Sequence, residues 1–341
     1  MTAEPAPDDA DAPAPNDAAE PMVEHARTTR PADPDALYVP DLTSVPDEPP
    51  KEILYHHKTT LKEGARAVWA HREIVLTLTE RDFRVQYKQA TLGVLWAILN
   101  PVATLIVLII VFSRVKGYNP PNEPFPLYLF VGILCWSFFA TSLGQGGNSL
   151  LSNKALLSKT QFPRECFPIE TMMVNGLNIV LSWIPLALLF LWYQQLPKPT
   201  TVWVPLCIVI EILFTAGVTL ATASLIVQFR DLSQIVPLVL SLGIFLTPVI
   251  WPLSKVPSQY HVTQAHLVNG QAVGGLTINL QVVYGFLNPL GPIIDTIRKT
   301  MLLGGNPTFA PLMAAAVGSV LYFVFGYMIF KKFEVSFADI A

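Results

Sequence analysis

A change from charged to apolar residues within positions 81–113 constrains the fold of this chain more than any other feature. The segment opens with RDFRVQYKQATLGVLWAILNP, and from Thr91 to Ser113 nearly every residue is apolar. A helix of that length can cross the hydrocarbon core of a bilayer, which is roughly 30 Å thick. The composition agrees, because 14% of the residues are charged, against about 25% in soluble domains. The sequence therefore predicts an integral membrane protein.

The residues before this apolar run predict a helix that lies in the membrane–water interface, at about 68–89. Arg81, Arg84 and Lys88 are spaced so that they share one helix face. An adjacent face carries Trp69, Leu76, Phe83 and Tyr87. Basic groups meet lipid phosphates, while aromatic rings enter the headgroup boundary. A basic flank on an ordinary first span explains the same residues, so both interpretations stay open here.

Six apolar stretches predict six membrane spans. They lie at about 91–113, 126–143, 169–193, 202–227, 233–250 and 309–330. The first follows a break at Leu92-Gly93. Leucines recur between the second and third spans, which indicates a short amphipathic helix at about 150–165.

A further apolar stretch, 282–303, is interrupted by Asn288-Pro289 and is too broken to cross the bilayer in one run. We interpret it as two short re-entrant helices, because such backbone is tolerated at membrane depth only where it lines a cavity. The predicted fold class is thus an all-α integral membrane protein with six transmembrane helices, an interfacial helix before them and two re-entrant helices before the last span.

The N-terminal segment differs sharply from the rest. Residues 1–50 hold 12 of the 25 acidic residues and 11 of the 30 prolines. Such a segment has too little apolar surface to order itself, so we expect a disordered tail. Residues 51–67 are polar and predict a linker. Segments predicted to lie on the same side of the membrane as the N-terminus carry more basic residues than segments on the other side. This bias predicts a multi-pass protein of the plasma membrane with both termini cytoplasmic.

Isolated polar residues at membrane depth are the main candidates for chemistry, because they are costly there. They are Glu170, Glu211, Asp231, Asp295 and Arg298. Asp295 and Arg298 are three residues apart and are predicted to pair on one helix face. The sequence contains no phosphate-binding loop, no catalytic motif and no metal-ligand spacing, its three cysteines included. We therefore predict no catalytic residue, no metal and no cofactor in this chain.

Five stretches, taken in order, resemble the membrane subunits of polysaccharide ABC exporters of the ABC-2 type. They are RDFRVQYKQATLGVLWAILNP at 81–101, LLSKTQFPRECFPIE at 156–170, QFRDLSQIVPLVL at 228–240, TPVIWPLSKVP at 247–257 and NPLGPIIDTIRKTMLLG at 288–304. The resemblance covers about residues 68–335. It implies a chain that pairs with a second copy and with two separate ATPase subunits, which bind ATP and Mg²⁺. It also implies transport of a polyprenyl-linked glycan among membrane lipids, with no role in binding nucleic acid.

The resemblance also assigns roles to residues. The inner gate for the lipid pyrophosphate would comprise Arg81, Arg84, Lys88, Leu92 and Gly93. Coupling to the ATPase would fall to Leu156, Leu157, Arg164 and Glu165. Candidates for the channel wall are Trp96, Phe245 and Trp251. The re-entrant helices would contain Asn288, Pro289, Asp295 and Arg298.

Two departures from the family pattern stand out. The acidic tail is longer than the family core requires, and residues 258–281 form an insertion whose Asn269-Gly270 and Gly274-Gly275 pairs indicate a small hairpin. The tail composition suggests a high-GC actinobacterium, in which the similar exporter moves lipid-linked galactan to the cell wall. The alternatives are an ABC permease for teichoic acid, one for a small lipid or drug, and a membrane glycosyltransferase.

Overall fold

The computed structural model describes residues 61–88, 90–113, 124–157, 163–261, 266–268, 271–273 and 277–334. The predicted tail 1–50, residues 51–60 of the predicted linker and residues 158–162 of the predicted coupling segment lie outside these ranges. The described residues belong to one unit, 58–341.

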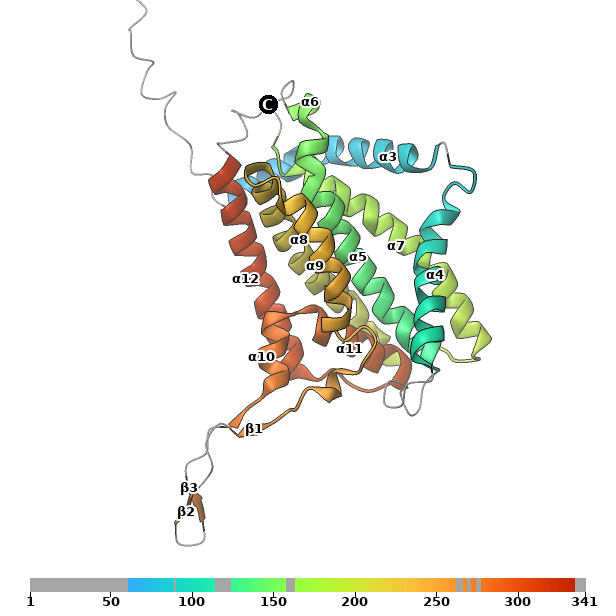
Figure 1. Ribbon diagram of the computed structural model, residues 1–341, viewed down its shortest axis with the longest axis vertical. Coiled ribbons are helices and arrows are strands. Elements are labelled where there is room, and N and C mark those ends of the chain that lie inside the picture. The colour runs from blue at the N-terminus through green and yellow to red at the C-terminus, as the bar shows by residue number, and fades with distance from the viewer. Residues whose placement is uncertain are drawn as a thin grey trace, which may run out of the picture. The chain divides into compact units, whose positions relative to one another are not determined.

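Long apolar helices form the body of the molecule. They are α4 (Leu95–Phe112), α5 (Phe125–Ser152), α7 (Cys166–Trp192), α8 (Val204–Gln228), α9 (Leu232–Leu246) and α12 (Phe309–Glu334). Helix α3 (Arg72–Lys88) crosses one end of this bundle, which we call the α3 end (Figure 1). Helices α10 (Leu280–Leu287) and α11 (Leu290–Arg298) lie at the opposite end, the α11 end (Figure 1). The described part of the chain is thus a helical membrane protein with a helix across one end.

The described part of the chain also contains short elements. They are α2 (Leu61–Ala70), α6 (Lys154–Leu157), the 3₁₀ helices Pro199–Trp203 and Leu253–Lys255, and a π-helical turn, Lys299–Leu303. Within the insertion 258–281, β1 (Tyr260–His261) pairs antiparallel with β4 (Thr277–Ile278), and β2 (His266–Val268) pairs antiparallel with β3 (Gln271–Val273). The β2–β3 pairing agrees with the small hairpin predicted for this segment. Asn269-Gly270 and Gly274-Gly275 themselves lie outside the described residues.

Helix α5 lies at the centre of the core. Side chains near its start, among them Leu127, Phe130 and Ile133, are fully buried together with Ile293 and Ile294 of α11. Helices α8 and α12 approach especially closely, because Gly217 and Gly326 face each other and a side chain at either position would collide with the neighbouring backbone. Small residues permit such close helix contacts in membranes.

The structure corrects several predicted boundaries. Residues 61–67, predicted as linker, belong to α2, and the predicted interfacial helix is two helices separated at His71. Lys, Glu, Arg and Ala are good helix formers, so a mixed polar stretch need not be a linker. Helix α9 ends at Leu246 rather than 250, because Thr247 precedes a proline and adopts an extended conformation (ψ 143°).

The number of spans is also lower than predicted when length is the criterion. Five described helices are long and apolar enough to cross a membrane. Helix α9 has 15 residues and is therefore about 22 Å long, short of a full hydrocarbon core. The sixth span stays a prediction.

Candidate functional site

Helix α3 presents its basic residues to the outside of the molecule. Its buried residues are Val75 and Thr79, which face α7, where the Thr79 hydroxyl lies 3.9 Å from the Met173 sulfur. Arg81, Arg84 and Lys88 are all exposed. The predicted basic face is therefore available to a ligand at the α3 end.

Each of the two arginines has an acidic neighbour on the same helix. The Arg81 Nε donates to Asp82 Oδ1 over 2.6 Å, and this hydrogen bond raises the pKa of Arg81. Arg84 forms an ion pair with Glu80. The buried carboxyl of Glu170, at the start of α7, lies close to Asp82 and Arg81. These pairs fix where the guanidinium groups sit, but most of the Arg84 side chain stays exposed.

The predicted aromatic face of this helix exists only in part. Trp69 belongs to α2 rather than α3, and both it and Leu76 are exposed. Phe83 and Tyr87 contact each other edge to face, with ring centroids 5.3 Å apart. The Tyr87 hydroxyl donates to Asn178 Oδ1 of α7 over 2.8 Å, so this ring holds α3 on the bundle.

A tight turn joins α3 to α4. Gly93 has φ +51°, a left-handed conformation that residues with a side chain rarely adopt. A side chain at this position would meet no atom within 4 Å, so the turn requires glycine for its backbone and not for space. Leu92 is exposed on the turn and Trp96 is exposed on the first turn of α4. The predicted break at Leu92-Gly93 is confirmed, and it places an apolar tip next to the basic face.

A polar strip on α5 was missed by sequence reasoning. The second span was predicted to end at 143, because Gly144, Gly146 and Gly147 suggested a loop, yet α5 continues to Ser152. Gly146 and Gly147 instead let α5 pack against Thr219 and Thr222 of α8.

The polar residues of this extended part recur every three or four positions and so lie along one side of the helix. Thr141, Gln145 and Ser152 are exposed and Asn148 is half-buried. That spacing, rather than the glycines, was the signal for a continued helix. We call Thr141, Gln145, Asn148 and Ser152 the α5 polar strip.

Helix α9 lies beside this strip, and its side chains are largely uncovered by the rest of the molecule. None of its residues is buried, although nearly all are apolar. Gly144 of α5 faces Leu240 of α9, which puts the two elements next to each other. Phe245 is exposed near the end of α9, and its place in the channel wall stays a prediction. Trp251 is more enclosed, since its indole N–H donates to the Phe245 carbonyl over 3.0 Å and its ring contacts Tyr284.

The α11 end is organised by Arg298, and here the predicted pairing with Asp295 is wrong. Arg298 is 3% exposed and donates to three backbone carbonyls: Tyr128 (2.9 Å), Pro248 (2.7 Å) and Val249 (2.5 Å). Its guanidinium also lies 3.7 Å from the centre of the Tyr128 ring. No ion pair with Asp295 occurs among the described residues. The guanidinium turns inward because carbonyls left without partners by the Thr247–Val249 turn need a donor.

Asn288 and Pro289 join α10 to α11. The Asn288 amide donates to the Thr247 hydroxyl over 2.9 Å and to the Tyr284 hydroxyl over 3.1 Å, and Tyr284 donates to the Leu246 carbonyl over 2.8 Å. Pro289 is buried and directly precedes α11. Together with Arg298, these groups tie the end of α9 to the two short helices.

The predicted coupling residues meet α12 at the α3 end. Glu165 is 1% exposed and forms an ion pair with Lys331, which also contacts Glu334 over 2.8 Å. Arg164 donates to the Glu334 carbonyl. Glu165 therefore does not face outward as predicted, because burial of its carboxylate is compensated by Lys331.

The leucines predicted for coupling lie on α6. Leu156 and Leu157 are partly buried against a cluster that includes Leu150, Phe167 and Phe330. A single helix over 150–165 is not present, since residues 150–152 end α5 and α6 has four residues. Short as it is, α6 projects at the α3 end (Figure 1).

These features define a class of protein: a multi-pass membrane protein with an exposed basic helix at one end, a polar strip along a central helix and a tied pair of short helices at the other end. The family model described as ABC-2 type transporter matches residues 73–267. The chain belongs to this family of transporter membrane proteins.

Characterised relatives give the comparison more detail. The chain is 30% identical over 274 residues to the O-antigen export system permease protein RfbA of Myxococcus xanthus, covering 80% of this chain and 97% of that protein. The RfbA protein of Klebsiella pneumoniae is 27% identical over 79% of the chain and 95% of its own length. The polysialic acid transport protein KpsM of Escherichia coli is 24% identical over 53% of the chain and 70% of its own length.

Proposed function

We propose that this chain is the transmembrane subunit of an ATP-driven exporter that moves a polyprenyl-pyrophosphate-linked polysaccharide from the cytoplasmic to the outer leaflet of the plasma membrane. Similarity to export permeases for O-antigen and to polysialic acid transport proteins supports a polysaccharide as the cargo. Our preferred cargo is an O-antigen-type or galactan-type chain. The chain performs no catalysis itself, and a separate ATPase subunit binds ATP and Mg²⁺.

The observation that carries this proposal is the α5 polar strip beside the bare apolar helix α9. Exposed amide and hydroxyl groups are costly when they face lipid tails. A second copy of the chain, packed through α9, would cover the apolar surface and enclose the strip. The strip would then line an aqueous path, in which hydroxyl and amide groups hydrogen-bond to sugar hydroxyls. Trp96 and Phe245, exposed on α4 and α9, would supply ring faces for the sugars along the path.

The α3 end is the cytoplasmic end in this proposal, and both chain termini are cytoplasmic. The basic residues Arg81, Arg84 and Lys88 then lie at headgroup depth, where the pyrophosphate of the cargo is presented. Guanidinium groups form charge-assisted bonds to phosphate oxygens. The turn at Leu92-Gly93 would admit the lipid between α3 and α4.

Two copies of the chain would bind two ATPase subunits through α6 and its leucines Leu156 and Leu157. Glu165 supports this surface from within by its ion pair with Lys331. Arg164 supports the same surface, because its guanidinium donates a hydrogen bond to the Glu334 carbonyl at the end of α12.

The test is export by the complete complex in cells that lack the chromosomal copy of this chain. Gln145→Trp should abolish export while the complex still assembles, because the ring would obstruct the strip. Leu188→Trp is the matched control, since Leu188 is exposed on α7 and lies outside the strip. Normal export with Gln145→Trp would exclude the strip as the path. Transport of a fluorescent small lipid but not of glycan by the purified complex would favour the small-lipid permease instead.

A further inference from the structure

A cavity in the core has no part in the path described above. It lies between α5, α7 and α8 and has a volume of about 350 Å³. Sites for small molecules commonly measure about 300–1,000 Å³, so the space is large enough for one. Its mouth is formed by Val180 and Trp183 of α7 and by Ile212 of α8, which are exposed and mostly hydrocarbon. Because both helices are of membrane-spanning length, the cavity opens toward lipid rather than toward water.

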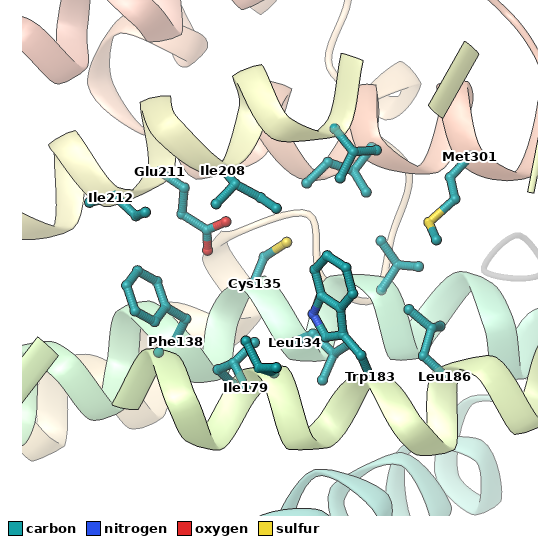
Figure 2. Close-up of a pocket in the computed structure, with 15 residues that line it drawn as sticks. Leu134, Cys135, Phe138, Ile179, Trp183, Leu186, Ile208, Glu211, Ile212 and Met301 are labelled. Carbon is teal, nitrogen blue, oxygen red and sulfur yellow. The ribbon is translucent and has the colours of Figure 1, made fainter. Parts of the chain in front are cut away.

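One carboxyl group points into this otherwise apolar space. Glu211 of α8 is 4% exposed, and Figure 2 shows its carboxyl directed into the cavity toward the Cys135 thiol of α5. Its Oε1 atom has no hydrogen-bond partner among the described residues. A buried polar atom without a partner is unfavourable, so the site favours a molecule that brings one.

A water bound at Glu211 would occupy only a small part of this cavity. The rest of the space is apolar, and apolar cavities stay dry. Apart from Glu211, the lining offers only the Cys135 thiol and the Trp183 indole as polar side-chain groups. The remaining wall consists of groups such as Leu134, Ile208 and Met301.

We infer that this cavity binds a membrane-soluble alcohol: a molecule with a hydrocarbon body that fills the apolar space and one hydroxyl that hydrogen-bonds to Glu211. A hydroxyl both donates and accepts, so it suits the carboxyl in either protonation state. The ligand enters from the bilayer between α7 and α8. The site is distinct from the α5 polar strip because α5 contributes to it from residues 131–138, nearer the start of the helix, whereas the strip occupies 141–152.

The test uses two photoreactive probes on the full-length chain in lipid nanodiscs. One is a long-chain alcohol with a diazirine in the middle of the chain, and the other is the matched alkane without the hydroxyl. Labelling of α7 and α8 peptides is measured by mass spectrometry and divided by labelling of the α12 peptide, whose Met313, Phe325 and Met328 are exposed, which corrects for probe concentration in the bilayer. We expect the ratio for the alcohol to exceed that for the alkane about fivefold or more, as a hydrogen bond to an otherwise unpaired buried acceptor would give. Equal ratios would overturn the inference, since they would show contact with surrounding lipid alone.

Variants localise the effect. Ile208→Trp fills the cavity and should remove the excess labelling by the alcohol. Val209→Trp, on the outer side of the same helix, should preserve it. Glu211→Leu should make the two probes equal, because the acceptor is gone. Persistence of the excess in Ile208→Trp would overturn the proposal.

A competition experiment on the wild-type chain guards against variants that do not fold. Unlabelled 1-dodecanol should reduce labelling of α7 and α8 by the alcohol probe, and dodecane at the same concentration should reduce it much less. Equal competition by the two compounds would likewise overturn the proposal.

Discussion

Charged groups at the two ends of the molecule are used in opposite ways. At the α11 end, Arg298 is enclosed and its three hydrogen bonds go to backbone carbonyls of α5 and of the turn after α9. At the α3 end, Arg84 has a side chain that is 75% exposed and pairs with Glu80 on its own helix. The same residue type thus joins distant segments at one end and faces outward at the other.

The difference distinguishes an arginine that stabilises the fold from one that is available to bind a ligand. A buried arginine that satisfies backbone carbonyls cannot be released for a ligand without a large loss of stability. An exposed ion pair contributes little to stability, so its charges can meet a ligand at small cost. The comparison predicts that substitutions at the α11 end act through folding, and that substitutions of basic residues on α3 act on transport with folding intact.

Arg298→Met should have the largest effect. It leaves the buried carbonyls of Pro248 and Val249 without a donor, while the Tyr128 carbonyl keeps its hydrogen bond within α5. Each unsatisfied group costs about 1–3 kcal/mol, so a loss of about 2–6 kcal/mol is expected. Unfolding of the purified chain can be followed with a thiol-reactive dye, because Cys135, Cys166 and Cys207 are all buried in the folded state. The midpoint of thermal unfolding should fall steeply.

Two further variants make this test specific. Lys299→Met removes a neighbouring exposed contact, the 2.9 Å hydrogen bond to Thr308, and should be nearly silent. Arg298→Lys keeps the charge but offers one nitrogen for three carbonyls, so its midpoint should lie between those of wild type and Arg298→Met. An unchanged midpoint in Arg298→Met would show that the α11 end is not held by this residue.

The α3 end contains one buried pair of its own, and breaking it should have the next largest effect. Lys331→Met leaves the Glu165 carboxylate buried without its cation, which we expect to cost about 2 kcal/mol. Lys332→Met is the control, because Lys332 is exposed and its ammonium group lies 5.9 Å from the centre of the Phe333 ring rather than in a buried ion pair. The dye assay compares the two midpoints. Equal midpoints would contradict a role for the ion pair in joining the start of α7 to α12.

Much of the architecture was predictable, since apolar length and glycine breaks are local signals. Helices α4, α7, α8 and α12 lie close to their predicted ranges, and the turn at Leu92-Gly93 is where the pattern breaks. Apart from the boundaries of α2 and α9, which have local causes, the errors arise where a residue acts through a partner far along the chain. Gly146 and Gly147 are tolerated inside α5 because α8 packs on them, and no local signal reveals that contact.

The candidate site shows the same division. The basic residues of α3 were predicted because their spacing alone places them on one face. The direction of Arg298 and the burial of Glu165 were not predictable, because both depend on groups some 50 to 170 residues away. The unpaired Oε1 atom of Glu211 and the cavity beside it likewise become visible only when α5, α7 and α8 are assembled.

Tyr87→Phe tests how firmly α3 is held. It removes the 2.8 Å hydrogen bond to Asn178, and a single bond of this kind contributes about 1 kcal/mol. The change should raise hydrogen exchange in α3 while the midpoint of global unfolding shifts little. Thr77→Val is the control, since the Thr77 hydroxyl bonds to the Glu73 carbonyl within the same helix. Similar exchange in both variants would show that Tyr87 does not dock α3 on α7.

Arg84→Lys should have the smallest effect on stability and the most informative effect on function. The exposed pair with Glu80 is worth about 0–0.5 kcal/mol, so the unfolding midpoint should be unchanged. If the basic face only attracts anionic lipid, at about 1 kcal/mol for each charge, lysine serves as well as arginine and export is normal. If the face grips a pyrophosphate, export should fall, because lysine lacks the planar fork that binds two phosphate oxygens at once. The measurement is accumulation of lipid-linked glycan on the cytoplasmic side, at equal amounts of assembled complex.

Lys88→Arg is the matched control, since it keeps the charge and adds a fork on the same face, and it should export normally. Normal export by the double variant Arg81→Ala, Arg84→Ala would remove these residues from the gate and leave the α3 end with a role in anchoring alone.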